Sequence, residues 1–123
     1  MRDKSKRNAQ VLLLTLMLLL LLGTQMPGAW RDEAFRVAHL PWQMTKVAHV
    51  VLFAAMAGVA TWRPLCMPLK RVLVGVVVLA VLTELLQHWV PNRNPSVWDV
   101  GFDIGGALLG CGLARWGLGE IEN

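Results

Sequence analysis

Polar and ionisable side chains recur at helical spacing within apolar parts of this 123-residue chain. Side chains three or four residues apart share one face of a helix. The groups with this spacing are Lys46 with His49, Glu84 with Gln87 and His88, and Asp99 with Asp103. Arg93 and Ser96 lie between the last two groups. Carboxylates, imidazoles and cations brought together in this way could bind a charged ligand or transfer a proton.

The sequence around these groups is apolar enough to lie in a membrane, where ionisable side chains are costly and need partners. Hydrophobic residues make up 55% of the chain and charged residues 16%, against roughly 25% charged in a soluble domain. A helical span needs about 20 mostly apolar residues. Four such spans are predicted, at roughly 9–29, 46–62, 72–90 and 99–116. We therefore expect an all-α polytopic membrane protein, with residues 1–123 forming a single four-transmembrane-helix bundle.

Prolines and tryptophans agree with these spans. All six prolines fall between them, where a missing backbone N–H is harmless. The six tryptophans lie at or just beyond the span ends, as is typical of lipid–water interfaces. The basic N-terminus before a leucine run also resembles a signal peptide, but the uncharged stretch exceeds the usual apolar region of about 7 to 15 residues. We predict a retained span.

The distribution of basic residues predicts the orientation. Eight of the twelve Lys and Arg residues lie at the N-terminus, in the 62–71 loop and near the C-terminus. Basic residues accumulate in cytoplasmic loops, so both termini are expected in the cytoplasm (N-in/C-in). This basic fringe would lie against anionic lipid, and nucleic acid need not be invoked. Cys66 and Cys111 then lie on the reducing side, where a disulfide is not expected.

Segment 27–45 would form the first outer loop. Its residues Trp30, Ala34 and Phe35 fall on one helical side, with Arg31 and Arg36 toward the other. Both a short helix lying in the interface and a plain polar loop remain open.

Orientation places all the polar groups at one depth, in the outer leaflet. Gly106 and Gly110 follow Asp103 on the same helical face. Small residues at that spacing let helix backbones approach closely, so Asp103 is expected to point into the bundle. The candidate ligand-binding residues are Lys46, His49, Glu84, Gln87, Arg93, Asp99 and Asp103.

The spacing of these residues resembles that of a known family. The pattern Glu84-x2-Gln87-x5-Arg93-x5-Asp99-x3-Asp103-x2-Gly106, preceded by Lys46-x2-His49, is similar to the motif of the VanZ-like family of small bacterial membrane proteins. The resemblance spans about residues 45–110. It implies a multi-pass helical bundle in the bacterial plasma (inner) membrane. The family's namesake is linked to low-level resistance to the glycopeptide teicoplanin, but a shared fold does not transfer a function.

Two positions depart from the family pattern. The family usually has Asn where this chain has Asp103, and commonly Asp where this chain has Thr45. The first change adds a negative charge and the second removes one. The total charge of the site would then be unchanged, with a carboxylate at position 103 in place of one at position 45. The resemblance therefore supports a role for Asp103 less than it supports the other site residues.

Three functions fit these residues. The site could bind a lipid headgroup or a lipid-linked envelope glycan precursor, with Arg93 and Lys46 holding phosphate and a possible link to glycopeptide or envelope-stress tolerance. It could instead be an intramembrane enzyme acting on such a lipid, with Glu84 or His49 as general base, although no nucleophile motif is present. It could also be a structural polar network. No recognised metal-ligand spacing occurs, and no cofactor is expected.

Overall fold

A computed structural model describes residues 2–41, 43–62, 65–91 and 97–122, with side chains from residue 3 to residue 117 within those ranges. These residues form five α-helices and no strand: α1 (Arg2–Gln25), α2 (Gly28–Val37), α3 (Met44–Thr61), α4 (Leu69–Gln87) and α5 (Val97–Glu122). The all-α prediction is confirmed for the described part of the chain.

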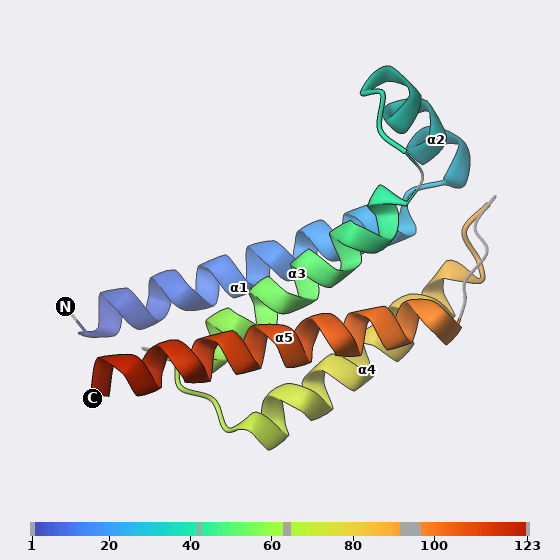
Figure 1. Cartoon of the computed structure of the whole chain (residues 1–123). Helices are drawn as coiled ribbons and strands as arrows, with labels where there is room; N and C mark the ends of the chain where they lie inside the picture. Colours follow the sequence, from blue (N-terminus) through green and yellow to red (C-terminus); the bar gives the residue numbers. More distant parts are fainter. Residues whose placement is uncertain (1, 42, 63–64, 92–96, 123) are drawn as a thin grey trace.

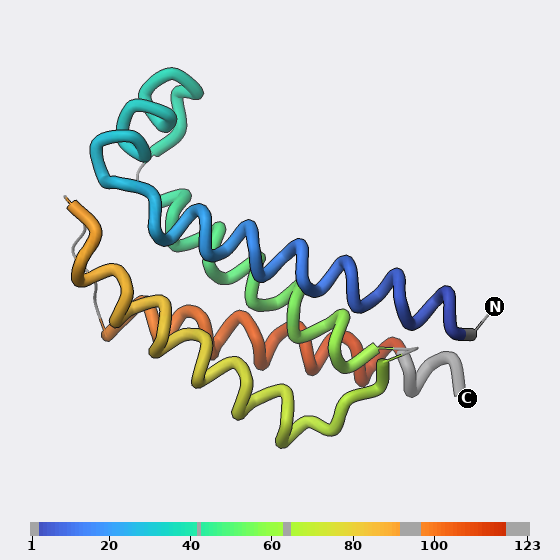
Figure 2. The backbone as a smooth tube through the Cα atoms, turned by 180° about the vertical axis from the view of Figure 1, so that it is seen from behind, coloured from blue at the N-terminus to red at the C-terminus, as the bar shows by residue number. Residues whose placement is uncertain are grey.

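The four long helices, α1, α3, α4 and α5, lie lengthwise beside one another, and α2 stands beyond one end of this bundle (Figures 1 and 2). Helix α3 packs against each of the other three, most extensively against α5, whereas the described residues of α1 and α5 do not pack together. We call the end near α2 the α2 end. The opposite end, where α1 begins and α5 ends, is the terminal end.

The helices differ from the predicted spans at their limits. Pro27 has an extended backbone (φ −54°, ψ 141°), so α1 stops at Gln25 and the last residues of the first predicted span belong to α2. Helix α4 ends at Gln87, short of the predicted 90, and α5 continues to Glu122. The alternative of a short helix in segment 27–45 is the correct one.

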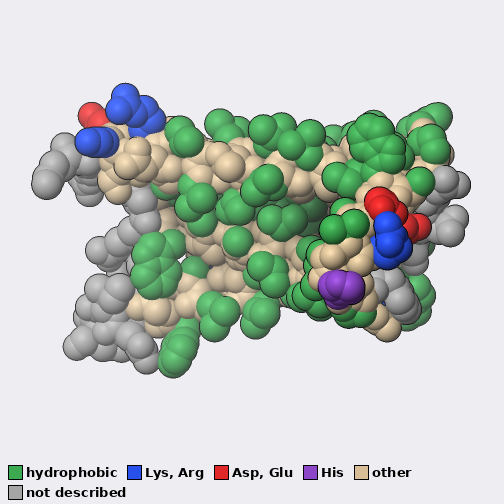
Figure 3. All heavy atoms as spheres, turned by 90° about the horizontal axis from the view of Figure 1, so that it is seen from above, with side chains coloured by type: hydrophobic (Ala, Val, Ile, Leu, Met, Phe, Trp, Pro, Cys, Tyr) green, Lys and Arg blue, Asp and Glu red, His purple; other side chains and the backbone are tan. Residues whose placement is uncertain are grey.

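Among the described residues, three helical segments are long and apolar enough to cross a membrane: Asp3–Gln25, Met44–Thr61 and Val97–Gly117. Large apolar side chains such as Leu14 and Leu22 are more than half exposed on α1, as lipid-facing residues are. In Figure 3, apolar side chains cover the middle of the visible face and charged ones gather at its two ends. These features indicate a membrane protein. Helix α4 carries Lys70, Arg71 and Glu84, and a fourth span stays a prediction.

The contact between α3 and α5 depends on glycine. A Cβ atom on Gly106 would lie 2.5 Å from the carbonyl oxygen of Val50, and one on Gly110 would overlap the backbone of Ala54. Nothing lies within 4 Å of the corresponding position on Gly105. The face carrying Gly106 and Gly110 is therefore the one that packs on α3, as the spacing predicts.

Replacing Gly110 with Ala should force α3 and α5 apart. We expect Gly110→Ala to lower the free energy of unfolding by on the order of 1–3 kcal/mol, the usual cost of overpacking. The matched variant Gly105→Ala places its methyl group in open space and should be neutral or slightly stabilising, because Ala favours helix. Unfolding of the purified protein in detergent micelles measures both. Equal stability of the two variants would contradict the packing described here.

Candidate functional site

A buried hydrogen bond joins α3 and α5 at the α2 end. It links His49 Nδ1 and Asp103 Oδ1 at 2.7 Å. Asp103 is completely buried and His49 is 7% exposed. Asp103 lies one turn before Gly106, so the glycine contact between the helices also brings these two side chains together. Since Nδ1 meets the carboxyl group, Nε2 is the ring nitrogen left for a ligand.

The second oxygen of the Asp103 carboxyl group is also enclosed. Oδ2 is buried and has no hydrogen-bond partner among the described residues. Buried polar atoms nearly always have such a partner. The Oδ2 atom of Asp103 can therefore still accept a hydrogen bond, whereas Oδ1 is bonded to His49.

Helix α4 adds further polar groups at the same end. Glu84 and Gln87 are buried, and the Thr83 hydroxyl donates to the carbonyl of Ala80 at 2.9 Å. Asp99 lies one turn before Asp103 on α5 and is half-buried. The structure thus brings together predicted site residues from three helices.

Lys46 and His88 have further surroundings that the sequence did not predict. The ammonium group of Lys46 lies over the Phe102 ring, 5.4 Å from its centroid, and lines a cavity of about 200 Å³ that His49 does not line. His88, predicted to share a face with Glu84, is exposed just beyond the end of α4.

The connection between α4 and α5 contains two residues of the predicted site. Arg93 and Ser96 lie outside the described residues. Their proposed roles therefore remain predictions.

His49 forms part of the wall of a pocket of about 230 Å³ enclosed by α1, α2 and α3. Its polar lining also includes Arg31, Thr24 and Thr45, and Phe35 is among its apolar residues. Arg31 was predicted on the opposite side of its helix from Phe35, which is wrong, because both line this pocket.

Hydrogen bonds between the helices position this pocket. The Gln25 side-chain amide donates to the Thr24 hydroxyl at 3.3 Å and to the Thr83 carbonyl at 3.5 Å, linking α1 to α4. The backbone N–H of Gly28, at the start of α2, donates to the Pro91 carbonyl at 3.0 Å. The sequence analysis did not predict roles for Thr24 and Gln25. Two adjacent polar residues at the end of a leucine-rich segment could have indicated them.

Metal binding receives no support from the described side chains. No group of three or more His, Cys, Asp or Glu residues among them could hold a metal ion. His49 and Asp103 instead pair with each other, an arrangement in which a carboxyl group fixes the orientation and tautomer of an imidazole.

Comparison with known proteins supports the family resemblance. No functionally curated protein and no solved structure matches the chain. The family model described as VanZ/LLP1 matches residues 3–118. That range includes the three membrane-compatible segments and the helices that carry His49, Glu84 and Asp103. The chain therefore belongs to the VanZ/LLP1 family.

Proposed function

We propose that this protein binds the phosphate-bearing headgroup of a membrane lipid, or of a lipid-linked envelope glycan precursor, at the α2 end. One observation carries the proposal. A pocket of about 230 Å³ holds a cationic side chain, Arg31, and an imidazole, His49, that is backed by a buried carboxyl group. Pockets that enclose a drug-sized ligand occupy roughly 300–1,000 Å³. This one suits a headgroup whose acyl or prenyl tails stay in the bilayer.

The proposed topology places the pocket in the outer leaflet of the plasma membrane. Helices α1, α3, α4 and α5 would each cross the membrane, with both termini cytoplasmic and α2 outside. Described basic residues are more numerous at the terminal end, as cytoplasmic ends require. From Val72 to Gln87, α4 is about 24 Å long at the usual helical rise, so it would span a bilayer core of about 30 Å only with its flanking residues.

Each polar group of the pocket has a chemical role in this proposal. The guanidinium group of Arg31 matches two phosphate oxygens in one plane. His49 would donate from Nε2 to a third oxygen when protonated, since Nδ1 is held by Asp103. The Thr24 and Thr45 hydroxyls would contact sugar or glycerol hydroxyl groups.

Arg31 can be redirected toward a ligand at little cost. It now contacts Asp32 at 3.1 Å, in a pair whose side chains are 28% and 70% exposed. Ion pairs this open to solvent contribute about 0–1 kcal/mol. A phosphate group could therefore replace Asp32 as the partner of Arg31.

An intramembrane enzyme is a second candidate, and the His49–Asp103 pair is the observation that favours it. A carboxyl group that orients an imidazole prepares it to act as a general base. The Thr24 hydroxyl of the pocket is poorly suited as a nucleophile, because it already donates to the Leu21 carbonyl at 3.3 Å. The enzyme would then have to activate water and hydrolyse the bound lipid.

The first test concerns the role of Arg31 in binding. We expect Arg31→Gln to weaken binding of a polyprenyl phosphate to the purified protein by about tenfold or more, because hydrogen bonds to a charged group are lost. Arg36→Gln is the matched control. Arg36 also lies on α2 and is ion-paired with Glu33, but it does not line the pocket. Titration followed by native mass spectrometry measures all three affinities.

Further outcomes separate the candidate functions. Unchanged affinity of a folded Arg31→Gln protein would rule out headgroup binding at this pocket. Conversion of the lipid to a new product, lost in His49→Gln, would establish the enzyme. Collapse of folded yield in both Arg31→Gln and His49→Gln would instead show that the polar groups are structural.

Chemical labelling of the native cysteines tests the proposed topology. Cys66 is exposed in the α3–α4 connection, and Cys111 is buried. We expect a membrane-impermeant maleimide to leave Cys66 unlabelled in intact cells and to label it once the membrane is opened. A Cys66→Ser variant measures the background labelling that does not come from Cys66. Labelling of Cys66 in intact cells would reverse the proposed orientation.

A further inference from the structure

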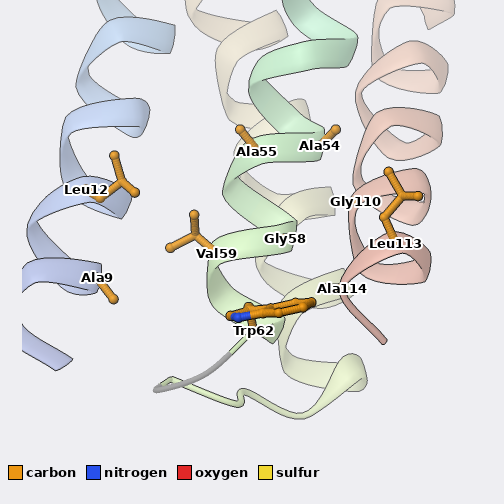
Figure 4. A pocket seen from close by; sticks show the side chains of 10 residues that line it. All are labelled: Ala9, Leu12, Ala54, Ala55, Gly58, Val59, Trp62, Gly110, Leu113 and Ala114. Carbon is orange, nitrogen blue, oxygen red and sulfur yellow. The ribbon is translucent and has the colours of Figure 1, made fainter. Parts of the chain in front are cut away.

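An open apolar groove of about 600 Å³ lies between α1 and α5 toward the terminal end (Figure 4). It exists because α1 and α5 do not pack together. The floor is α3, where Ala55 and Gly58 are too small to fill the space, and Ala9 and Leu113 line the two sides. The groove lies toward the opposite end of the bundle from the pocket that His49 lines.

Trp62 closes the groove at its terminal end. Its six-membered ring occupies the space left by Gly117, where a Cβ atom would lie 2.5 Å from ring carbons Cη2 and Cζ3. The indole nitrogen is on the side of the ring nearer α1 (Figure 4). Tryptophan favours the membrane interface, where its ring is apolar and its N–H meets polar groups. An ester carbonyl of a phospholipid is an acceptor found at that depth.

The terminal end is strongly basic. Lys6 lies three residues before Ala9, so it continues the groove face of α1 by one turn toward the solvent. Figure 3 shows the basic side chains gathered at the start of α1. Other exposed basic side chains at this end are Lys4, Arg7, Lys70, Arg71 and Arg115. Such a cluster attracts anionic lipid headgroups.

We propose that this groove binds one anionic phospholipid of the surrounding bilayer. An acyl chain would lie between α1 and α5, its ester carbonyl would accept from the Trp62 N–H, and its phosphate would lie beside Lys6. The groove volume falls within the roughly 300–1,000 Å³ of small-molecule sites.

The basic charge of the terminal end favours a lipid over a second copy of the chain as the occupant of the groove. Two copies in the same orientation would bring their basic ends together, and like charges repel. A helix with its side chains also needs a channel about 10–12 Å wide, whereas an acyl chain is far narrower. An anionic lipid fills the groove and offsets the basic charge.

The experiment uses native mass spectrometry of the full chain in micelles containing equal amounts of phosphatidylglycerol and phosphatidylcholine with the same acyl chains. We expect preferential retention of phosphatidylglycerol. Ala55→Leu fills the groove and should lower retention of both lipids by one bound molecule, because it leaves the separate pocket lined by Arg31 and His49 unchanged. Gly112→Leu is the control, since Gly112 is exposed on α5 with nothing within 4 Å of a Cβ, and it should retain lipid as the wild type does.

A charge variant tests the headgroup contact without disturbing the groove. Lys6→Gln should lower the preference for phosphatidylglycerol by about fivefold, the effect of one basic side chain near a membrane surface. Lys6 is exposed, so this variant keeps the proposal testable if Ala55→Leu fails to fold. Equal retention of the two lipids by the wild type, or unchanged retention in Ala55→Leu, would overturn the proposal. So would a wild-type dimer that Ala55→Leu converts to monomer, because a second copy would then fill the groove.

Discussion

The close approach of α3 and α5 is the constraint on which the rest of the structure depends. Within a bilayer, helices gain little from the hydrophobic effect, and close packing and hydrogen bonds hold them together. Gly106 and Gly110 let the α5 backbone reach that of α3 at Val50 and Ala54. At this separation, His49 and Asp103 form a hydrogen bond of 2.7 Å between the same two helices. Packing and polar chemistry therefore share one interface.

The contact between α3 and α5 also explains where cavities remain beside α3. Because α5 occupies one side of α3 so closely, α1 packs on another side and does not reach α5. The spaces beside α3 differ in chemistry at the two ends. At the α2 end, a pocket contains Arg31 and His49. Toward the terminal end, a groove is lined mainly by apolar side chains and ends at Trp62. We propose a headgroup site for the first and an acyl-chain site for the second.

Helical spacing predicted the face of α5 that packs on α3, but it does not predict which side chains of other elements a face will meet. The face shared by Asp103, Gly106 and Gly110 follows from the 3.6-residue period, and the structure confirms that it packs on α3. Arg31 and Phe35 are four residues apart and therefore share a face of α2, so the prediction that put them on opposite sides misapplied the spacing. That this face lines the pocket depends on the direction of α2, which follows from the turn at Pro27 and the hydrogen bond from the Gly28 N–H to the Pro91 carbonyl. The contact of the Lys46 ammonium group with the Phe102 ring was also not predicted, because it joins two helices. The contact between His49 and Asp103 was not predicted, because it joins residues 54 positions apart on two helices.

The coupling between His49 and Asp103 tests the account most directly. A double-mutant cycle with His49→Ala, Asp103→Ala and the double variant, measured as free energies of unfolding in micelles, isolates their interaction from the rest of the fold. A stabilising interaction energy of about 0.5–3 kcal/mol is predicted, as for residues in direct buried contact. Additivity within about 0.3–0.5 kcal/mol would contradict the claim that this hydrogen bond joins α3 to α5 at the centre of the site.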